Sequence, residues 1–312
     1  MHLGTDNNKN YTGAIQVWHF LLHLRWHYQL FILSGGFLLG GFLSSGLHVQ
    51  WFIIQFLNVQ LLLFGGATAY NSYWDGDIGP IGGLKHPPKM TRWMWAASLI
   101  IQMVGLLLAI PFGRLYLSVY AFSMLLFWVY SSPWTRWKGR PLKSLLAIGI
   151  STGFDSVLLG YLAAGNRTVP PYVLIAAVGV MFLLLSLYPI SQIYQQEEDT
   201  RRGDQTFAIQ YGKVVVFRFF ELAFLAGLIL ISVAILHFHL LMGILFGVIG
   251  LTTGVIVRFH VKTLTSGKED YSKVMRIKYG TSMAFVIFLL IGLLLKHTAI
   301  NGISSVVNLL LK

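Results

Sequence analysis

Asn71-Ser-Tyr-Trp-Asp75-Gly-Asp77 closes an apolar run, residues 50–72, that is long enough to form a helix across a bilayer. The stretch places a carboxamide and two carboxylates close together in a chain that has only 11 acidic residues among 312. Residues four positions apart lie on one face of a helix, so Asn71 and Asp75 should point the same way if the helix continues that far. We therefore expect a membrane-length helix with a polar, acidic end.

A second acidic stretch, Gln195-Gln-Glu-Glu-Asp199-Thr-Arg-Arg-Gly-Asp204, also closes an apolar run and repeats the four-residue spacing. Either stretch alone is typical of an ordinary polar helix end. Acidic residues at a membrane boundary are costly unless they are solvated or paired, which favours a functional reading of the two together. Two oxygen-rich helix ends followed by basic residues suit Mg²⁺ and a diphosphate, because Mg²⁺ prefers oxygen ligands and shares its shell with substrate phosphates.

The composition indicates a membrane protein that crosses the bilayer several times. The chain is 55% hydrophobic and 11% charged, and its mean hydropathy is +0.67. It has no cysteine, which excludes disulfides and thiolate sites. The net charge of +12 alone would be compatible with nucleic-acid binding, but the apolar content argues against it.

Apolar segments of spanning length recur along the chain and predict an all-α fold of about nine transmembrane helices around a central cavity. Very short turns alternate with longer polar loops, so the long loops should all lie on one side. We expect one domain over residues 1–312, with an interfacial tail at 298–312. The predicted spans are 28–47, 50–72, 92–112, 115–132, 143–164, 170–190, 217–236, 239–258 and 280–297.

The basic residues assign a side to the long loops. Of the 23 Lys and Arg residues, all but four fall on the side of the N-terminus and the long loops. By the positive-inside rule this side is cytoplasmic, so both acidic stretches should face the cytoplasm and the C-terminus the outside. The expected location is the cell or inner membrane. The four exceptions are Arg114, Arg167, Lys296 and Lys312.

Basic loops on the same side could bind a diphosphate. The stretch from Tyr130 to Pro141 interleaves aromatic and basic residues, although basic loops are expected on the cytoplasmic face in any case. Metal and basic residues there would stabilise the diphosphate that leaves an allylic substrate, and an aromatic cavity would shelter the carbocation. The candidate diphosphate-binding residues are Lys85, Tyr130, Arg136, Lys138, Arg201 and Arg202.

Asp155 lies inside the predicted span 143–164. A carboxylate within the membrane is a functional candidate by default, here one that orients an acceptor or takes its proton. The alternative is a structural hydrogen bond to Ser151, Thr152 or a neighbouring helix. The sequence leaves both open.

These motifs resemble the UbiA superfamily of intramembrane prenyltransferases, whose members have nine helices, a first motif Asn-xxx-Asp-xxx-Asp and a second motif Asp-xxx-Asp. The resemblance covers about residues 20–295 and includes the loops at Tyr130–Pro141 and from Asp199 to Gly212. It implies that Asn71, Asp75 and Asp199 are catalytic and metal-binding residues.

Two positions depart from the family pattern. The third acid of the first motif would fall at Gly79, and Gln195 replaces the first acid of the second motif. The resemblance therefore implies Asp77, Gln195 and Glu198 as substitute Mg²⁺ ligands.

The predicted function is Mg²⁺-dependent transfer of an isoprenyl group from a polyprenyl diphosphate to a lipophilic acceptor. The acceptor could be an aromatic quinone precursor, a tetrapyrrole or another lipid. One alternative is a UbiA-type terpene cyclase, in which the cation is captured within the same chain. The other is a transporter or lipid-binding membrane protein. Such a protein should have several charged residues in the middle of its helices, whereas here Asp155 is nearly alone in that position. The oligomeric state is left open.

Overall fold

A computed structural model describes the backbone of residues 13–310 and the side chains of residues 13–296. The described chain is helical, with no strand beyond one isolated bridge between Ile81 and Leu84. The predicted all-α membrane fold is therefore confirmed. In the first half the helices are α1 (Gly13–Leu24), α2 (Trp26–Tyr28), α3 (Gly35–Phe42), α4 (Val49–Leu57), α5 (Gly65–Asp75), α6 (Arg92–Ala109) and α7 (Arg114–Ser131).

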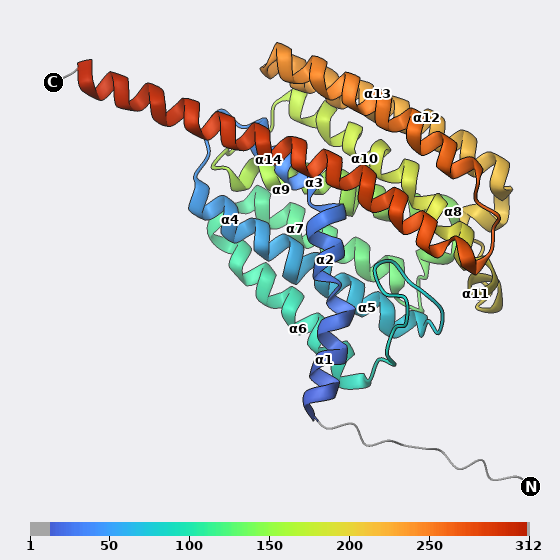
Figure 1. Ribbon diagram of the computed structural model, residues 1–312. Helices are drawn as coiled ribbons and strands as arrows, with labels where there is room; N and C mark the ends of the chain where they lie inside the picture. Colours follow the sequence, from blue (N-terminus) through green and yellow to red (C-terminus); the bar gives the residue numbers. More distant parts are fainter. Residues whose placement is uncertain (1–12, 311–312) are drawn as a thin grey trace, which may run out of the picture.

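The second half contains the longest helices (Figure 1). They are α8 (Pro141–Ile148), α9 (Asp155–Ala163), α10 (Pro171–Gln192), α11 (Gln196–Arg201), α12 (Phe207–Phe238), α13 (Leu240–Lys262) and α14 (Tyr271–Leu310). Short 3₁₀ turns lie at Ile110–Phe112, Trp137–Gly139, Ile193–Gln195 and Lys268–Asp270.

Seven helical segments among the described residues are long and apolar enough to cross a membrane. The other two predicted spans, 28–47 and 115–132, are also largely helical, so the number nine is approximate. The second of them, α7, contains three tyrosines and three serines that lower its hydropathy. The seven segments are 49–75, 92–112, 141–163, 171–201, 207–238, 240–262 and 268–296.

The first predicted span, 28–47, is helical as far as Phe42 and contains a π-helical turn. Arg25 adopts a left-handed conformation, with φ 48°, between α1 and α2. A π-helical turn, Gln29–Leu33, separates α2 from α3, which ends at Phe42. Similar π-turns at Asn58–Phe64 and Gly149–Phe154 join α4 to α5 and α8 to α9. Such wide turns are frequent at functional sites, and all three contribute residues to the cavity described below.

Close packing of helix backbones holds the bundle together. A Cβ atom at Gly160 of α9 would collide with the backbone of Phe37 in α3, and one at Gly40 would collide with that of Val157. Helices α10 and α12 approach each other in the same way at Gly227. Small residues permit this contact in membrane bundles, where van der Waals packing drives helix association.

Large apolar side chains face outward on α6, α12 and α13, as expected for helices in contact with lipid. Figure 1 shows α12 and α13 side by side at one edge of the bundle, with α14 crossing it diagonally. The backbone of α14 runs on through most of the predicted tail 298–312, whose side chains lie outside the described residues. The N-terminal residues 1–12, including Lys9, also lie outside them.

Candidate active site

The helix α5 carries Asn71 and Asp75 to one wall of an internal cavity. The helix continues through Asp75 and ends because Gly76 takes the left-handed conformation, with φ 56°. Asn71 and Asp75 consequently share a face, and both line the cavity. The Asn71 amide donates to Oγ of Ser131 on α7 at 3.2 Å.

Asp75 is paired with the loop that follows α7. Its side chain is only 1% exposed, and its Oδ2 accepts a hydrogen bond from the Lys138 ammonium. Nη2 of Arg136 lies 3.6 Å from Oδ1, which has no hydrogen-bond partner. Burial opposes the charge of Lys138, but the carboxylates of Asp75, Asp77 and Asp199 outweigh it and raise the Lys138 pKa. Lys138 is therefore held as a buried cation.

Arg202 joins the two acidic stretches. It donates to Oδ1 of Asp77 and, at 2.6 Å, to Oδ1 of Asp199, which is almost fully buried. Burial disfavours its charge, but Asp75 and Asp77 more than compensate, so its pKa is raised. Burial and the nearby Asp75 raise the pKa of Asp77, against the opposing effect of Lys138 and Arg202.

Arg136 and Asp204 tie the third loop to the second acidic stretch. Nε and Nη2 of Arg136 donate to the two carboxylate oxygens of Asp204, each at 2.7 Å. This bidentate geometry is the strongest form of a carboxylate–guanidinium pair. Asp204 was not selected from the sequence as a site residue, although its place in the acidic stretch was the available signal.

The carboxylate of Glu198 binds backbone N–H groups directly after the first acidic stretch. Its Oε1 accepts hydrogen bonds from the N–H groups of Ile78 and Gly79, at 2.9 and 2.8 Å. A Cβ atom at Gly79 would lie 2.8 Å from the other oxygen, Oε2. Glu198 thus occupies the space into which a side chain at position 79 would project. Gln195 lies beside it, lines the cavity and approaches the carbonyl of Pro80 at 3.4 Å.

The cavity has a volume of about 220 Å³ and two chemically different ends. Asn71, Asp75, Asp77 and Lys138 form its polar end, and the rest of the lining combines many apolar side chains with polar ones. Tyr130 lies at the wall, with its hydroxyl 2.9 Å from that of Tyr188. The apolar lining includes Ile32, Leu33, Phe64, Phe127, Val180, Leu187 and Phe285.

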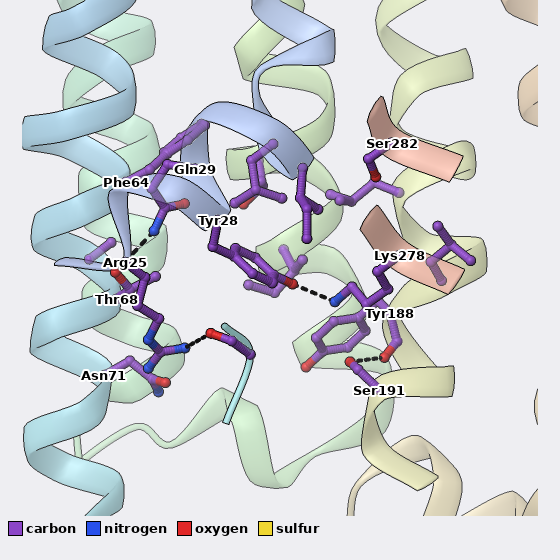
Figure 2. A pocket seen from close by; sticks show the side chains of 18 of the residues that line it. Arg25, Tyr28, Gln29, Phe64, Thr68, Asn71, Tyr188, Ser191, Lys278 and Ser282 are labelled. Carbon is purple, nitrogen blue, oxygen red and sulfur yellow. Dashed lines mark hydrogen bonds between the residues drawn. The ribbon is translucent and has the colours of Figure 1, made fainter. Parts of the chain in front are cut away.

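Two further cations also line the cavity (Figure 2). Arg25 lies between α1 and α2 and donates to Oγ of Ser72 at 2.6 Å. Lys278 comes from α14 and donates to the hydroxyl of Tyr28. No local motif marks either residue, because each is a single charge in an otherwise apolar or mixed segment.

Seven predicted site residues are not part of the cavity lining. Four of them, Arg136, Glu198, Asp199 and Arg202, contact the acidic stretches as described above, and the other three lie elsewhere. Lys85 is exposed in the loop 76–91, and Arg201 is exposed and pairs with Glu197. Asp155 is buried and accepts a hydrogen bond from Oγ of Ser123 on α7 at 2.7 Å. This bond to a neighbouring helix matches the structural alternative for Asp155.

The acidic side chains suit Mg²⁺ by their chemistry. As arranged in the described residues, no group of three His, Asp or Glu side chains could hold a metal ion. Instead, Lys138 and Arg202 supply positive charge among Asp75, Asp77 and Asp199. The unpartnered Oδ1 of Asp75 leaves one buried anionic oxygen for a ligand. Carboxylate and amide oxygens are the donors that Mg²⁺ prefers, so this set fits the ion by donor type.

Comparisons with known proteins bear on the family and the fold. The model of the UbiA prenyltransferase family matches residues 32–280. A UbiA homologue from Archaeoglobus fulgidus, solved with DMAPP and Mg²⁺, is 15% identical, with a TM-score of 0.68 over 88% of this chain and 99% of the other. The same homologue with GPP and Mg²⁺ is 16% identical, with the same TM-score and coverage.

A structure of digeranylgeranylglyceryl phosphate synthase is also similar. It is 18% identical, with a TM-score of 0.58 over 89% of this chain and 99% of the other. At such identities the likeness concerns the fold. No curated protein matches the chain.

Proposed function

Because the chain belongs to the UbiA prenyltransferase family, we propose that it transfers an isoprenyl group from a polyprenyl diphosphate to a lipophilic acceptor. The observation that carries the proposal is the two-ended cavity. Its polar end gathers Asp75, Asp77 and Lys138, and its remaining lining includes many apolar side chains. An amphipathic substrate with a charged head and a hydrocarbon tail matches both ends.

The metal ligands in this proposal are the carboxylates of Asp75, Asp77 and Asp199, together with Asn71. Structures of the Archaeoglobus homologue with a prenyl diphosphate and Mg²⁺ support the choice of ion. When bound, Mg²⁺ neutralises charge on the leaving diphosphate. Gln195 and Glu198 are weaker candidates, because the first approaches a backbone carbonyl and the second accepts from two backbone N–H groups.

Basic residues of this chain provide the remaining positive charge. Lys138 lines the cavity, and Arg136 and Arg202 lie directly behind the same carboxylates. Since negative charge develops on the diphosphate as the allylic C–O bond breaks, cations fixed in advance at this end stabilise the transition state. Their pairing with buried carboxylates holds them in place before substrate arrives.

The apolar end protects the reactive cation. As the C–O bond breaks, its electron pair leaves with the diphosphate and the isoprenyl carbon becomes electron-deficient. Phe64, Phe127 and Phe285 line this part of the cavity and exclude water. Aromatic faces also attract cations. The acceptor then forms the new bond to the isoprenyl carbon and releases a proton.

The orientation in the membrane is part of the proposal. The acidic stretches and the basic loops 132–140 and 201–206 lie at one end of the bundle, where Gly139 O accepts from Gln205 N. The excess of Lys and Arg on this side supports a cytoplasmic position. The diphosphate would then enter from the cytoplasm, and the whole chain would act as one unit.

Product analysis tests the proposed function. Purified protein in lipid nanodiscs is mixed with labelled geranylgeranyl diphosphate, Mg²⁺ and a panel of quinone precursors, tetrapyrroles and lipids. We expect a labelled product in which the isoprenyl group is joined to one of the acceptors and the diphosphate has been lost. No such product should form when Mg²⁺ is chelated. A labelled hydrocarbon formed without any acceptor would instead indicate a cyclase. Absence of Mg²⁺-dependent turnover with every substrate would contradict the proposal.

A further inference from the structure

Lys278 is a buried cation on the α14 wall of the cavity. The residue is only 8% exposed, and it lines the cavity together with Thr281, Ser282 and Phe285, which follow it along one face of the helix. Its ammonium donates to the hydroxyl of Tyr28 and lies 5.2 Å from the centre of that ring. Within the described side chains, no carboxylate lies within 4 Å of it.

Arg25 provides a second, independent observation on the same cavity. It is 7% exposed, and its Nε has no hydrogen-bond partner. Its other nitrogens donate to neutral acceptors, the Ser72 hydroxyl and the Gly82 carbonyl. Figure 2 shows Arg25 and Lys278 on either side of Tyr28.

The two cations differ from those of the acidic end. Lys138, Arg136 and Arg202 are each paired directly with a carboxylate of the chain. Asp75 and Asp77 act on Arg25 only from beyond salt-bridge distance. A buried charge is costly unless an anion pairs with it, so an anionic ligand would be bound favourably beside Arg25 and Lys278.

We propose that Lys278, together with Arg25 and the Tyr28 hydroxyl, forms a subsite that binds an oxyanion of a substrate. The inference rests on the proposed function and extends it to the α14 side of the cavity. The oxyanion has two possible sources with the same chemistry. One is the diphosphate, reaching past the acidic end, and the other is a carboxylate, phosphate or phenolate of the acceptor.

Equilibrium binding distinguishes these sources without requiring turnover. The first probe is geranylgeranyl diphosphate with Mg²⁺, compared with the uncharged geranylgeraniol. The second is 4-dodecylbenzoate, compared with 4-dodecylbenzamide, added to protein saturated with the diphosphate. The variants are Lys278→Gln, Lys278→Arg and a control, Arg276→Gln. Arg276 is exposed on the same helix, so the control removes a charge without touching the cavity.

Loss of a charge-assisted bond in a buried site should weaken anion binding by about tenfold or more. We expect Lys278→Gln to weaken the binding of either the diphosphate or the benzoate by that factor. The probe whose binding is weakened identifies the source of the oxyanion. Binding of the uncharged partners should not change, Lys278→Arg should retain most of the affinity, and Arg276→Gln should behave like wild type. A thermal melt of each variant checks folding.

The proposed subsite is contradicted if Lys278→Gln binds both anions as tightly as wild type, or if the variant also loses the same affinity for the uncharged probes. The proposed function fails separately, if wild-type protein does not bind geranylgeranyl diphosphate with Mg²⁺. A wild type that binds neither anion would overturn both.

Discussion

Glu198 holds Gly79 in place across 119 residues of sequence, because its Oε1 accepts a 2.8 Å hydrogen bond from the Gly79 N–H. The same oxygen accepts from Ile78, so one carboxylate joins the two acidic stretches. Asp77 lies next to this contact and bonds to Arg202. Glu198 therefore positions the first acidic stretch through its backbone.

Glu198→Gln should have a mild effect, since an amide oxygen can still accept from both N–H groups. We expect its turnover to stay within about threefold of wild type, with the same Mg²⁺ requirement, because neutral hydrogen bonds keep about half the strength of charge-assisted ones and these two bonds only position the backbone. Glu198→Ala should lose more activity and stability. A Mg²⁺ titration of turnover is the measurement. A tenfold rise in the Mg²⁺ needed by Glu198→Gln would show instead that Glu198 is a metal ligand.

The neighbours Arg201 and Arg202 should differ strongly. Arg202→Ala removes the partner of Asp77 and Asp199 and leaves buried carboxylates unpaired, which typically costs about 3–5 kcal/mol. We expect at least about a 100-fold loss of turnover. Arg201→Ala removes only an exposed pair with Glu197 and should change turnover less than about threefold. Similar losses of turnover in the two variants would contradict the assignment of Arg202, and not Arg201, to the site.

Arg136 and Asp204 should act as one unit. Each single alanine variant loses both hydrogen bonds of the bidentate pair, so the double variant should lose little more than either single one. A double-mutant cycle on kcat/KM for the prenyl diphosphate should give a coupling energy of about 1–3 kcal/mol. Additive losses would mean that the two residues act independently.

Asp155→Asn should be tolerated. Asparagine can still accept the hydrogen bond from Ser123, and Asp155 does not line the cavity. We expect turnover within about threefold of wild type, whereas loss of a proton-accepting carboxylate would cost about 100-fold or more. Steady-state kinetics of the purified variant decide between these outcomes, with Ser123→Ala as the variant that breaks the bond from the other side.

The sequence predicted the fold well because hydrophobic segment length is a strong signal in membrane proteins. In the first predicted span, 28–47, it did not show the π-turn at Gln29–Leu33 or the end of the helix at Phe42. The apolar pattern of a segment cannot show such a change, because α-helical and π-helical turns are formed by the same types of residue. The membrane orientation stays a prediction.

For the site, the sequence motifs drew attention to Asn71, Asp75, Lys138 and Arg202, which the structure gathers at one end of the cavity or beside it. These residues stand out because each lies in a dense polar stretch. Lys278 could not be found in this way, as its contact with Tyr28 spans 250 residues. The sequence also pointed to Lys85 as a diphosphate-binding residue, but a basic residue in a loop does not reveal whether its side chain reaches the cavity.

The most direct measurement is the turnover of labelled geranylgeranyl diphosphate by Asp75→Asn, with Glu197→Gln as the control. The first variant removes a charge that faces the cavity and keeps the shape, and the second changes an exposed acid that pairs with exposed Arg201 and Lys268. We predict at least about a 100-fold loss for Asp75→Asn, because about 1.4 kcal/mol of lost transition-state stabilisation is tenfold. Glu197→Gln should match wild type, whose activity should vanish with EDTA and return with Mg²⁺. Full activity in Asp75→Asn, or turnover without a metal, would contradict a diphosphate site at Asp75.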